Sequence, residues 1–294
     1  MTQPGWTAIG VPVDSVGRQG GTEHAPAALR ATGLLGRLGA SDRGDLDVRI
    51  RGDERDPETG VIGIAGVLET TAAVRAAVRD AVAAGERPLV MGGCCSLVPG
   101  ALAGVRDAIG RAGVAYVDGH VDVYDGRTSP TGEAADMPLG VAFGRVPAAW
   151  VEAAGGPIAA PEDVVVLGAR DPEEADDVAG LLAGELGALT VHGPADLRGA
   201  GLEAAGRTAA DRLGRFWIHL DVDVLDEAAM PATDYLMPGG LEWAELAALM
   251  GPLGAAPGLV GLSLGCVNPD KDPGGRYAER TGDLLARALG GATG

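Results

Sequence analysis

Short runs of apolar residues alternate along the chain with longer stretches whose apolar residues recur at helical spacing. The short runs predict strands at residues 8–13, 47–50, 87–91, 114–117, 163–167, 189–192, 216–220 and 258–264, with 47–50 as an edge strand. The longer stretches predict helices at 27–38, 61–84, 97–112, 138–144, 147–153, 172–186, 202–213, 240–250 and 276–289. This alternation predicts an α/β fold with a mainly parallel sheet covered on both faces. We find no internal repeat or linker and expect a single domain over residues 1–294.

Polar residues with metal-binding side chains follow the apolar run at 114–117. Asp118, His120 and Asp122 stand at every second position. Because period two is the strand period, the spacing predicts that the three side chains leave the chain on one face. Two carboxylates and an imidazole on one face are a plausible metal site. The alternative is a strand end with solvated carboxylates or a helix N-cap.

A second apolar run, from residue 216, ends in the same way. Asp221 and Asp223 follow it, again two positions apart. If these carboxylates were only solvated strand ends or helix N-caps, two apolar strands would have to end in aligned ligands by accident. The occurrence of both stretches therefore favours a metal site. The histidines inside predicted strands, His192 and His219, are interpreted as packing or hydrogen-bonding residues.

Composition narrows the class of partner. The 294 residues carry a formal net charge of −18, which argues against nucleic acid or an anionic membrane as partner. The same charge suits a small cationic substrate. No apolar run reaches the length of a membrane span, and the N-terminus shows no signal-peptide pattern. Three cysteines, two of them adjacent, form no disulfide framework, so a reducing cytoplasm is expected.

Several short motifs occur in an order that is typical of one enzyme family. They are Ile9-Gly10-Val11-Pro12, Met91-Gly92-Gly93, Asp118-Gly119-His120-Val121-Asp122, Asp221-Val222-Asp223 and Val267-Asn268-Pro269. With them the chain resembles the arginase/agmatinase (ureohydrolase) family over nearly its whole length. The resemblance implies a three-layer α/β/α sandwich with a parallel, roughly eight-stranded sheet. It also implies a homo-oligomer, either a trimer or a hexamer, and two Mn²⁺ ions that activate water to attack a guanidino carbon and release urea.

The resemblance also implies roles for the acidic stretches. Asp118 and Asp221 would bridge the two metals. Asp122 would complete the first metal site and orient the nucleophile, while His120 and Asp223 would complete the second. Carboxylates with one imidazole suit Mn²⁺ better than a soft metal.

The chain departs from the family pattern at positions that carry chemistry. Cys95 stands where a histidine ligates the first metal, and Cys266 stands where a glutamate grips the guanidinium. The arginase proton-shuttle histidine would fall near Ala135, and Glu133 stands about where an amide holds the substrate's α-carboxylate. A thiolate is a poor ligand for Mn²⁺, so either the first site is weak or it prefers Zn²⁺ or Fe²⁺. Buried cysteines can also be plain small hydrophobes.

These departures shape the functional hypothesis. We expect a metal-dependent hydrolase of a non-peptide C–N bond in a linear amidine or modified guanidino compound, and not plain arginine. One alternative is a catalytically silent member that serves as a binding or regulatory protein. Another is thiol chemistry, with Cys95 or Cys266 as nucleophile. The expected catalytic residues are Asp122 and Cys266, and the expected substrate contacts are Thr131, Glu133, Asp136, Asp171, Glu173 and Cys266.

Overall fold

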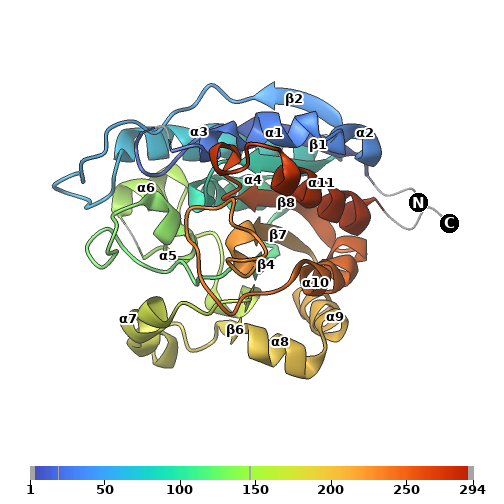
Figure 1. Cartoon of the computed structure of the whole chain (residues 1–294). Helices are drawn as coiled ribbons and strands as arrows, with labels where there is room; N and C mark the ends of the chain where they lie inside the picture. The colour runs from blue at the N-terminus through green and yellow to red at the C-terminus, as the bar shows by residue number, and fades with distance from the viewer. Residues whose placement is uncertain (1–3, 19, 146, 291–294) are drawn as a thin grey trace.

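A β-sheet runs through the middle of the computed structural model, with helices packed on both of its faces (Figure 1). The structure describes residues 4–18, 20–145 and 147–290, so the predicted domain ends at 1 and 294 lie outside it. The single-domain organisation stays a prediction, although all eight strands belong to one sheet. Within the described residues, no helix combines the length and the apolar character needed to cross a bilayer.

The sheet has eight strands in the order β2-β1-β3-β8-β7-β4-β5-β6, and all neighbouring strands pair in parallel. This confirms the predicted fold class. The strands are β1 Trp6–Val11, β2 Ser41–Asp45, β3 Arg87–Gly92, β4 Gly113–Val117, β5 Val164–Leu167, β6 Thr190–His192, β7 Phe216–Asp221 and β8 Leu259–Gly265.

The helices confirm the predicted alternation with strands. They are α1 Ala25–Ala31, α2 Leu34–Leu38, α3 Ile64–Ala83, α4 Val98–Ile109, α5 Pro138–Ala142, α6 Ala148–Ala153, α7 Pro172–Ala183, α8 Pro194–Ala200, α9 Leu202–Leu213, α10 Trp243–Ala255 and α11 Arg276–Leu289. Short 3₁₀ turns also occur, including η2 at Cys95–Leu97 and η5 at Val222–Val224. Helix α8 was not predicted; it begins with a proline in its first turn, where the missing N–H costs no helical hydrogen bond.

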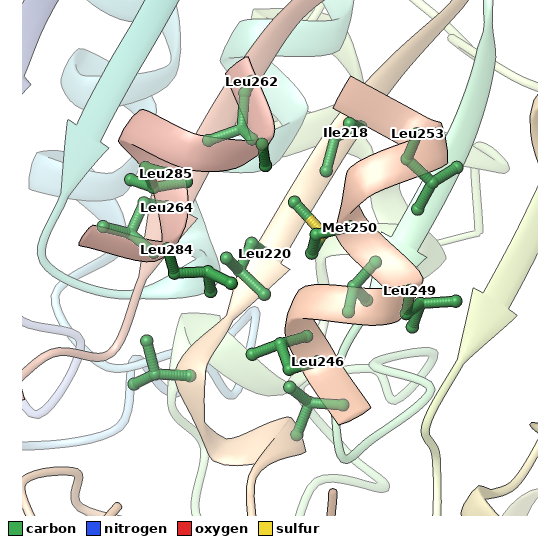
Figure 2. Packing of buried hydrophobic residues seen from close by; sticks show 14 of the residues in the cluster. Ile218, Leu220, Leu246, Leu249, Met250, Leu253, Leu262, Leu264, Leu284 and Leu285 are labelled. Atoms are coloured by element: carbon green, nitrogen blue, oxygen red, sulfur yellow. The ribbon is translucent and has the colours of Figure 1, made fainter. Parts of the chain in front are cut away.

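Two hydrophobic layers lie on opposite faces of the sheet because successive strand residues point to opposite sides. In β4, Ala115 and Val117 join the layer under α1, α2 and α8 to α11, whereas Val114 and Tyr116 join the layer under α3 to α7. Figure 2 shows the first layer, in which side chains of β7 and β8 pack against leucines of α10 and α11. Each fully buried leucine contributes about 1.5–3 kcal/mol to folding.

Strand order at the centre of the sheet decides where the functional residues meet. β3 and β4 are consecutive in sequence, yet β8 and β7 lie between them. Because all four strands are parallel, their carboxyl ends reach the same edge of the sheet. The segments that follow β3, β8, β7 and β4 are therefore neighbours, and ligands bind at this edge in open parallel sheets.

The predicted edge strand at 47–50 is wrong. The edge strand is β2, Ser41–Asp45, which pairs with β1 and exposes most of its polar side chains. Val48 and Ile50 are buried, but they lie in a loop that packs into the core. Val48 and Ile50 are apolar because they contact the core, not because they pair in a strand. The polar residues of β2 are typical of an exposed edge strand, where apolar residues would favour aggregation.

Candidate metal centre

Asp118, His120 and Asp122 do not lie in a strand. β4 ends at Val117, and the chain leaves the sheet at Asp118, so the predicted period-two alignment is wrong. Asp122 has a φ of 55°, in the left-handed region that non-glycine residues seldom adopt. The carboxylate of Glu174 holds this loop, because it accepts hydrogen bonds from the backbone N–H groups of Val121 at 2.6 Å and Asp122 at 2.7 Å.

The second acidic stretch also bends at its end. Asp221 is the last residue of β7, and Asp223 lies in the 3₁₀ turn η5. The Asp221 side chain caps this turn by accepting from the backbone N–H of Asp223 at 2.8 Å. The shared strand face predicted for the two carboxylates is therefore wrong: the strand end places Asp221 at the carboxyl edge, and the turn places Asp223 there.

One group of four possible metal ligands gathers at this edge. Cys95, Asp118, His219 and Asp221 each offer one ligand atom, and these atoms all lie within 4.8 Å of one another. Cys95 Sγ lies 2.7 Å from Asp221 Oδ2 and 3.2 Å from His219 Nε2. His219 Nε2 lies 3.9 Å from Asp118 Oδ2. All four side chains are buried.

A second group contains Asp118, His120 and Asp223. His120 Nδ1 lies 3.0 Å from Asp223 Oδ2 and 3.5 Å from Asp118 Oδ1. Asp118 belongs to both groups, with Oδ2 toward His219 and Oδ1 toward His120. A carboxylate with one oxygen toward each group can bridge two metal ions.

Burial and the repulsion between neighbouring carboxylates disfavour negative charge at Asp118 and Asp221. Burial, reinforced by the neighbouring Asp223, raises the pKa of Asp118 to about 7. Burial also raises the pKa of Asp221 well above the usual carboxyl value. A divalent cation between the two carboxylates would offset both effects and favour their charged forms. The donor set therefore fits metal ions, with oxygen and nitrogen donors in the second group and an added sulfur donor in the first.

His219 is the ligand candidate that sequence analysis missed. Burial lowers the pKa of His219 to about 3, so its imidazole is neutral. A signal was present, because His219 stands two positions before Asp221 within β7 and two residues of a strand at that spacing share a face. His219 does lie in a strand with a hydrogen-bond partner, as predicted, and its other ring nitrogen faces the ligand group.

Asp122 lines the cavity at this edge but belongs to neither group. The hydroxyl of Tyr116 donates to Asp122 Oδ2 at 2.5 Å, and Tyr116 in turn packs on the ring of His219, with centroids 4.8 Å apart. The position of the Asp122 carboxylate is thus fixed from two sides, by Tyr116 at its oxygen and by Glu174 at its backbone.

The cavity has a volume of about 300 Å³ and reaches both groups of ligands. Five predicted substrate-contact residues line it: Thr131, Asp136, Asp171, Glu173 and Cys266. Ala135 lines it as well. Among the described residues of this lining, His120 is the only basic side chain, so the cavity is strongly acidic.

Glu133, the remaining predicted contact, is not among the residues that line this cavity. Its carboxylate accepts a hydrogen bond from the Ser15 hydroxyl at 2.9 Å. Thr131 and Asp136 are also engaged with each other, because the Thr131 hydroxyl donates to Asp136 Oδ2 at 2.6 Å. The loop is therefore ordered by its own hydrogen bonds.

Comparison with known proteins agrees with this arrangement. The model of the Arginase family matches residues 5–291. The arginase of Bacillus caldovelox is 31% identical over 294 residues, covering 96% of this chain and 97% of that protein. Its structure superposes with a TM-score of 0.89 at 28% identity, covering 100% of both chains. The arginase structure from Bacillus cereus gives 0.88 at 25% identity, covering 99% of this chain and 100% of that one. The chain belongs to the arginase (ureohydrolase) family of hydrolases.

Proposed function

We propose that this protein hydrolyses a non-peptide C–N bond in a linear amidine or modified guanidino compound, and that plain arginine is not its substrate. The observation that carries the proposal is the position of Cys266. Its side chain lines the cavity with Sγ 3.7 Å from Cys95 Sγ, beside the metal-ligand groups. A thiol carries no charge at neutral pH at its ordinary pKa, so it cannot pair with a guanidinium as a carboxylate would.

Different residues at the carboxyl edge of the sheet have the roles of binding metal, orienting water and contacting the substrate. Asp118, His120, Asp221 and Asp223, with Cys95, would hold divalent metal ions that polarise water and the substrate carbon. Asp122, held by Tyr116 and Glu174, orients the attacking water. Cys266 contacts the reacting end of the substrate.

The acidic cavity favours a cationic substrate. Asp136, Asp171 and Glu173 all line it, and carboxylates in a confined cleft concentrate cations and repel anions. We therefore propose an amine, or an amino acid masked at its carboxyl group, as the better substrate. Ala135 also lines the cavity, and its side chain has no group that could donate a proton to a leaving amine.

A substrate screen tests the proposal. Metal-loaded protein is incubated with agmatine, arginine, N-substituted guanidines and formamidines, and mass spectrometry detects any C–N cleavage. We expect agmatine-like amines to exceed their carboxylated counterpart arginine in kcat/KM by at least about tenfold, which corresponds to about 1.4 kcal/mol. The preference should shrink at high salt, because salt screens the acidic cavity. N-substituted guanidines or formamidines should exceed both, because the neutral thiol of Cys266 cannot pair with a plain guanidinium.

Arginine as the best substrate would overturn the specificity. Loss of the amine preference in Glu173→Gln, with Asp176→Asn as the matched change on the same helix, would support the acidic cavity. Cleavage of none of these compounds by protein that holds its metals would favour the catalytically silent alternative.

Three finer features are part of the proposal. We propose Mn²⁺ for the group that contains His120, since its donors are two carboxylates and an imidazole.

All three cysteines are free thiols, which supports a cytoplasmic location. A homo-oligomer, trimer or hexamer, is expected from the family, and light scattering on a sizing column measures it directly.

A further inference from the structure

We infer that Cys95, His219, Asp118 and Asp221 form a thiolate–imidazole–carboxylate site that binds Zn²⁺ in preference to Mn²⁺, with His219 as a direct ligand. The inference rests on the proposed function only in placing a metal at this edge of the sheet. It goes further by naming the ligand set of one site and the metal that this set selects.

The geometry of the four atoms suits a tetrahedral ion. Bonds of about 2.3 Å to sulfur and about 2.0–2.2 Å to nitrogen and oxygen place neighbouring ligands of a tetrahedral Zn²⁺ about 3.3–3.7 Å apart. The recorded separations from Cys95 Sγ are 2.7 Å to Asp221, 3.2 Å to His219 and 3.9 Å to Asp118. These values bracket the tetrahedral spacing, so small shifts of the side chains would admit the ion.

The backbone presents these ligands at the carboxyl ends of three central strands of the sheet. His219 and Asp221 lie in β7, Asp118 directly follows β4, and Cys95 lies in η2 after β3. β7 pairs with β4 on one side and β8 on the other. Ligands on paired strands, or in the short segments directly after them, are held close to the geometry that the ion needs, and little ordering is required on binding.

The surroundings of His219 orient it as a ligand. His219 Nδ1 lies 2.9 Å from the hydroxyl oxygen of Ser263, its register partner in β8. The indole N–H of Trp217 donates to the same oxygen at 2.9 Å. A hydroxyl oxygen has two lone pairs and can accept both hydrogen bonds. With Nδ1–H donating to Ser263, the lone pair of Nε2 faces Cys95, as metal-ligating histidines require.

The donor chemistry separates Zn²⁺ from Mn²⁺. A thiolate is a soft donor, and sites built from nitrogen, oxygen and sulfur donors bind Zn²⁺ more tightly than Mn²⁺. The group around His120 contains no sulfur. The two halves of the centre therefore differ in metal preference, and the sulfur-containing half selects the softer ion.

Metal binding without substrate tests the inference. The intact reduced protein is stripped of metal and titrated with Co²⁺, which reports thiolate ligation by a near-ultraviolet charge-transfer band. We expect the band with the first equivalent, its displacement by Zn²⁺, and an affinity for Zn²⁺ at least a thousandfold above that for Mn²⁺. X-ray absorption at the zinc edge of the wild-type protein should show one sulfur neighbour, which requires no variant to fold.

Two sets of variants sharpen the result. Cys95→Ser should abolish the band, while Cys94→Ser, an adjacent buried thiol outside the group, should keep it. His219→Gln should weaken the first Zn²⁺ equivalent at least tenfold, and Ser263→Ala should weaken it less. No sulfur neighbour in the wild type, a band that survives Cys95→Ser, or equal affinity for Mn²⁺ and Zn²⁺ would overturn the inference. Zinc bound through sulfur without any turnover would instead count against the proposed function alone.

Discussion

The thiols of Cys95 and Cys266 lie 3.7 Å apart, Sγ to Sγ, although 171 positions separate them in the chain. They meet because β3 and β8 are neighbours in the sheet and both cysteines follow the carboxyl ends of these strands. The backbone N–H of Cys266 donates to the carbonyl of Gly93 at 2.6 Å and ties the two segments together.

The two thiols differ in access, and this predicts an order of alkylation. Cys266 is partly exposed, whereas Cys94 and Cys95 are both only 3% exposed. Because reaction requires access to the sulfur, iodoacetamide should modify Cys266 first in the native metal-free protein. Intact-mass measurement followed by peptide mapping determines the order. In Cys266→Ser the fast label should disappear, and first labelling at Cys95 in the wild-type protein would contradict the predicted order.

Glu174→Gln should destabilise the loop that carries Asp122. The Glu174 carboxylate accepts from two backbone N–H groups, and a glutamine amide would set its NH₂ against one of them. The expected cost is about 1.5–3 kcal/mol. Thermal unfolding should show Tm lower by several degrees, at about 2–4 °C for each kcal/mol. Asp176→Asn, an exposed acid on the same helix, should leave Tm nearly unchanged. An equal effect of the two changes would show that Glu174 does not act through these hydrogen bonds.

Gly93→Ala should be strongly destabilising. A Cβ at Gly93 would lie 1.6 Å from the backbone carbonyl oxygen of Val13, which cannot move aside as a flexible side chain could. The loop leading to Cys95 would have to shift, at a cost of at least about 1–3 kcal/mol. Gly180→Ala in α7 meets nothing within 4 Å and should instead stabilise by about 0.5–1 kcal/mol. Urea unfolding midpoints compare the two, and a tolerated Gly93→Ala would show that the backbone relaxes easily there.

Glu133 should make stability depend on pH. Burial raises the pKa of Glu133 to about 7 from its ordinary 4.5, so the folded protein holds a proton that the unfolded chain releases. Unfolding free energy should therefore fall as pH rises from about 4.5 to 7. Glutamine can still accept from Ser15 but never ionises. The Tm of Glu133→Gln minus that of wild type should therefore increase between pH 5 and pH 8. Glu69→Gln, at an exposed acid of α3, is the control. A constant difference for Glu133→Gln would mean that burial does not raise the pKa of Glu133.

Local sequence patterns determined the class of fold. Apolar runs of strand length alternate with helical periodicity, and parallel strands joined by helices are the arrangement that buries both faces. The same patterns located the acidic stretches around Asp118 and Asp221 at strand ends, because an apolar run that stops at a carboxylate marks the point where the chain leaves the core. They could not place the edge strand, since the exposed residues of Ser41–Asp45 have no apolar face to detect.

Only the tertiary structure decided how the site is assembled. The insertion of β8 and β7 between β3 and β4 brings Cys95, Cys266 and His219 together, and strand pairing across such sequence distances depends on long-range packing. The left-handed backbone at Asp122 depends on Glu174, which lies on a different element. The same applies to Glu133, which bonds to Ser15 rather than lining the cavity. Periodicity reports contacts within one segment, whereas each of these features arises from contacts between segments that a local pattern does not encode.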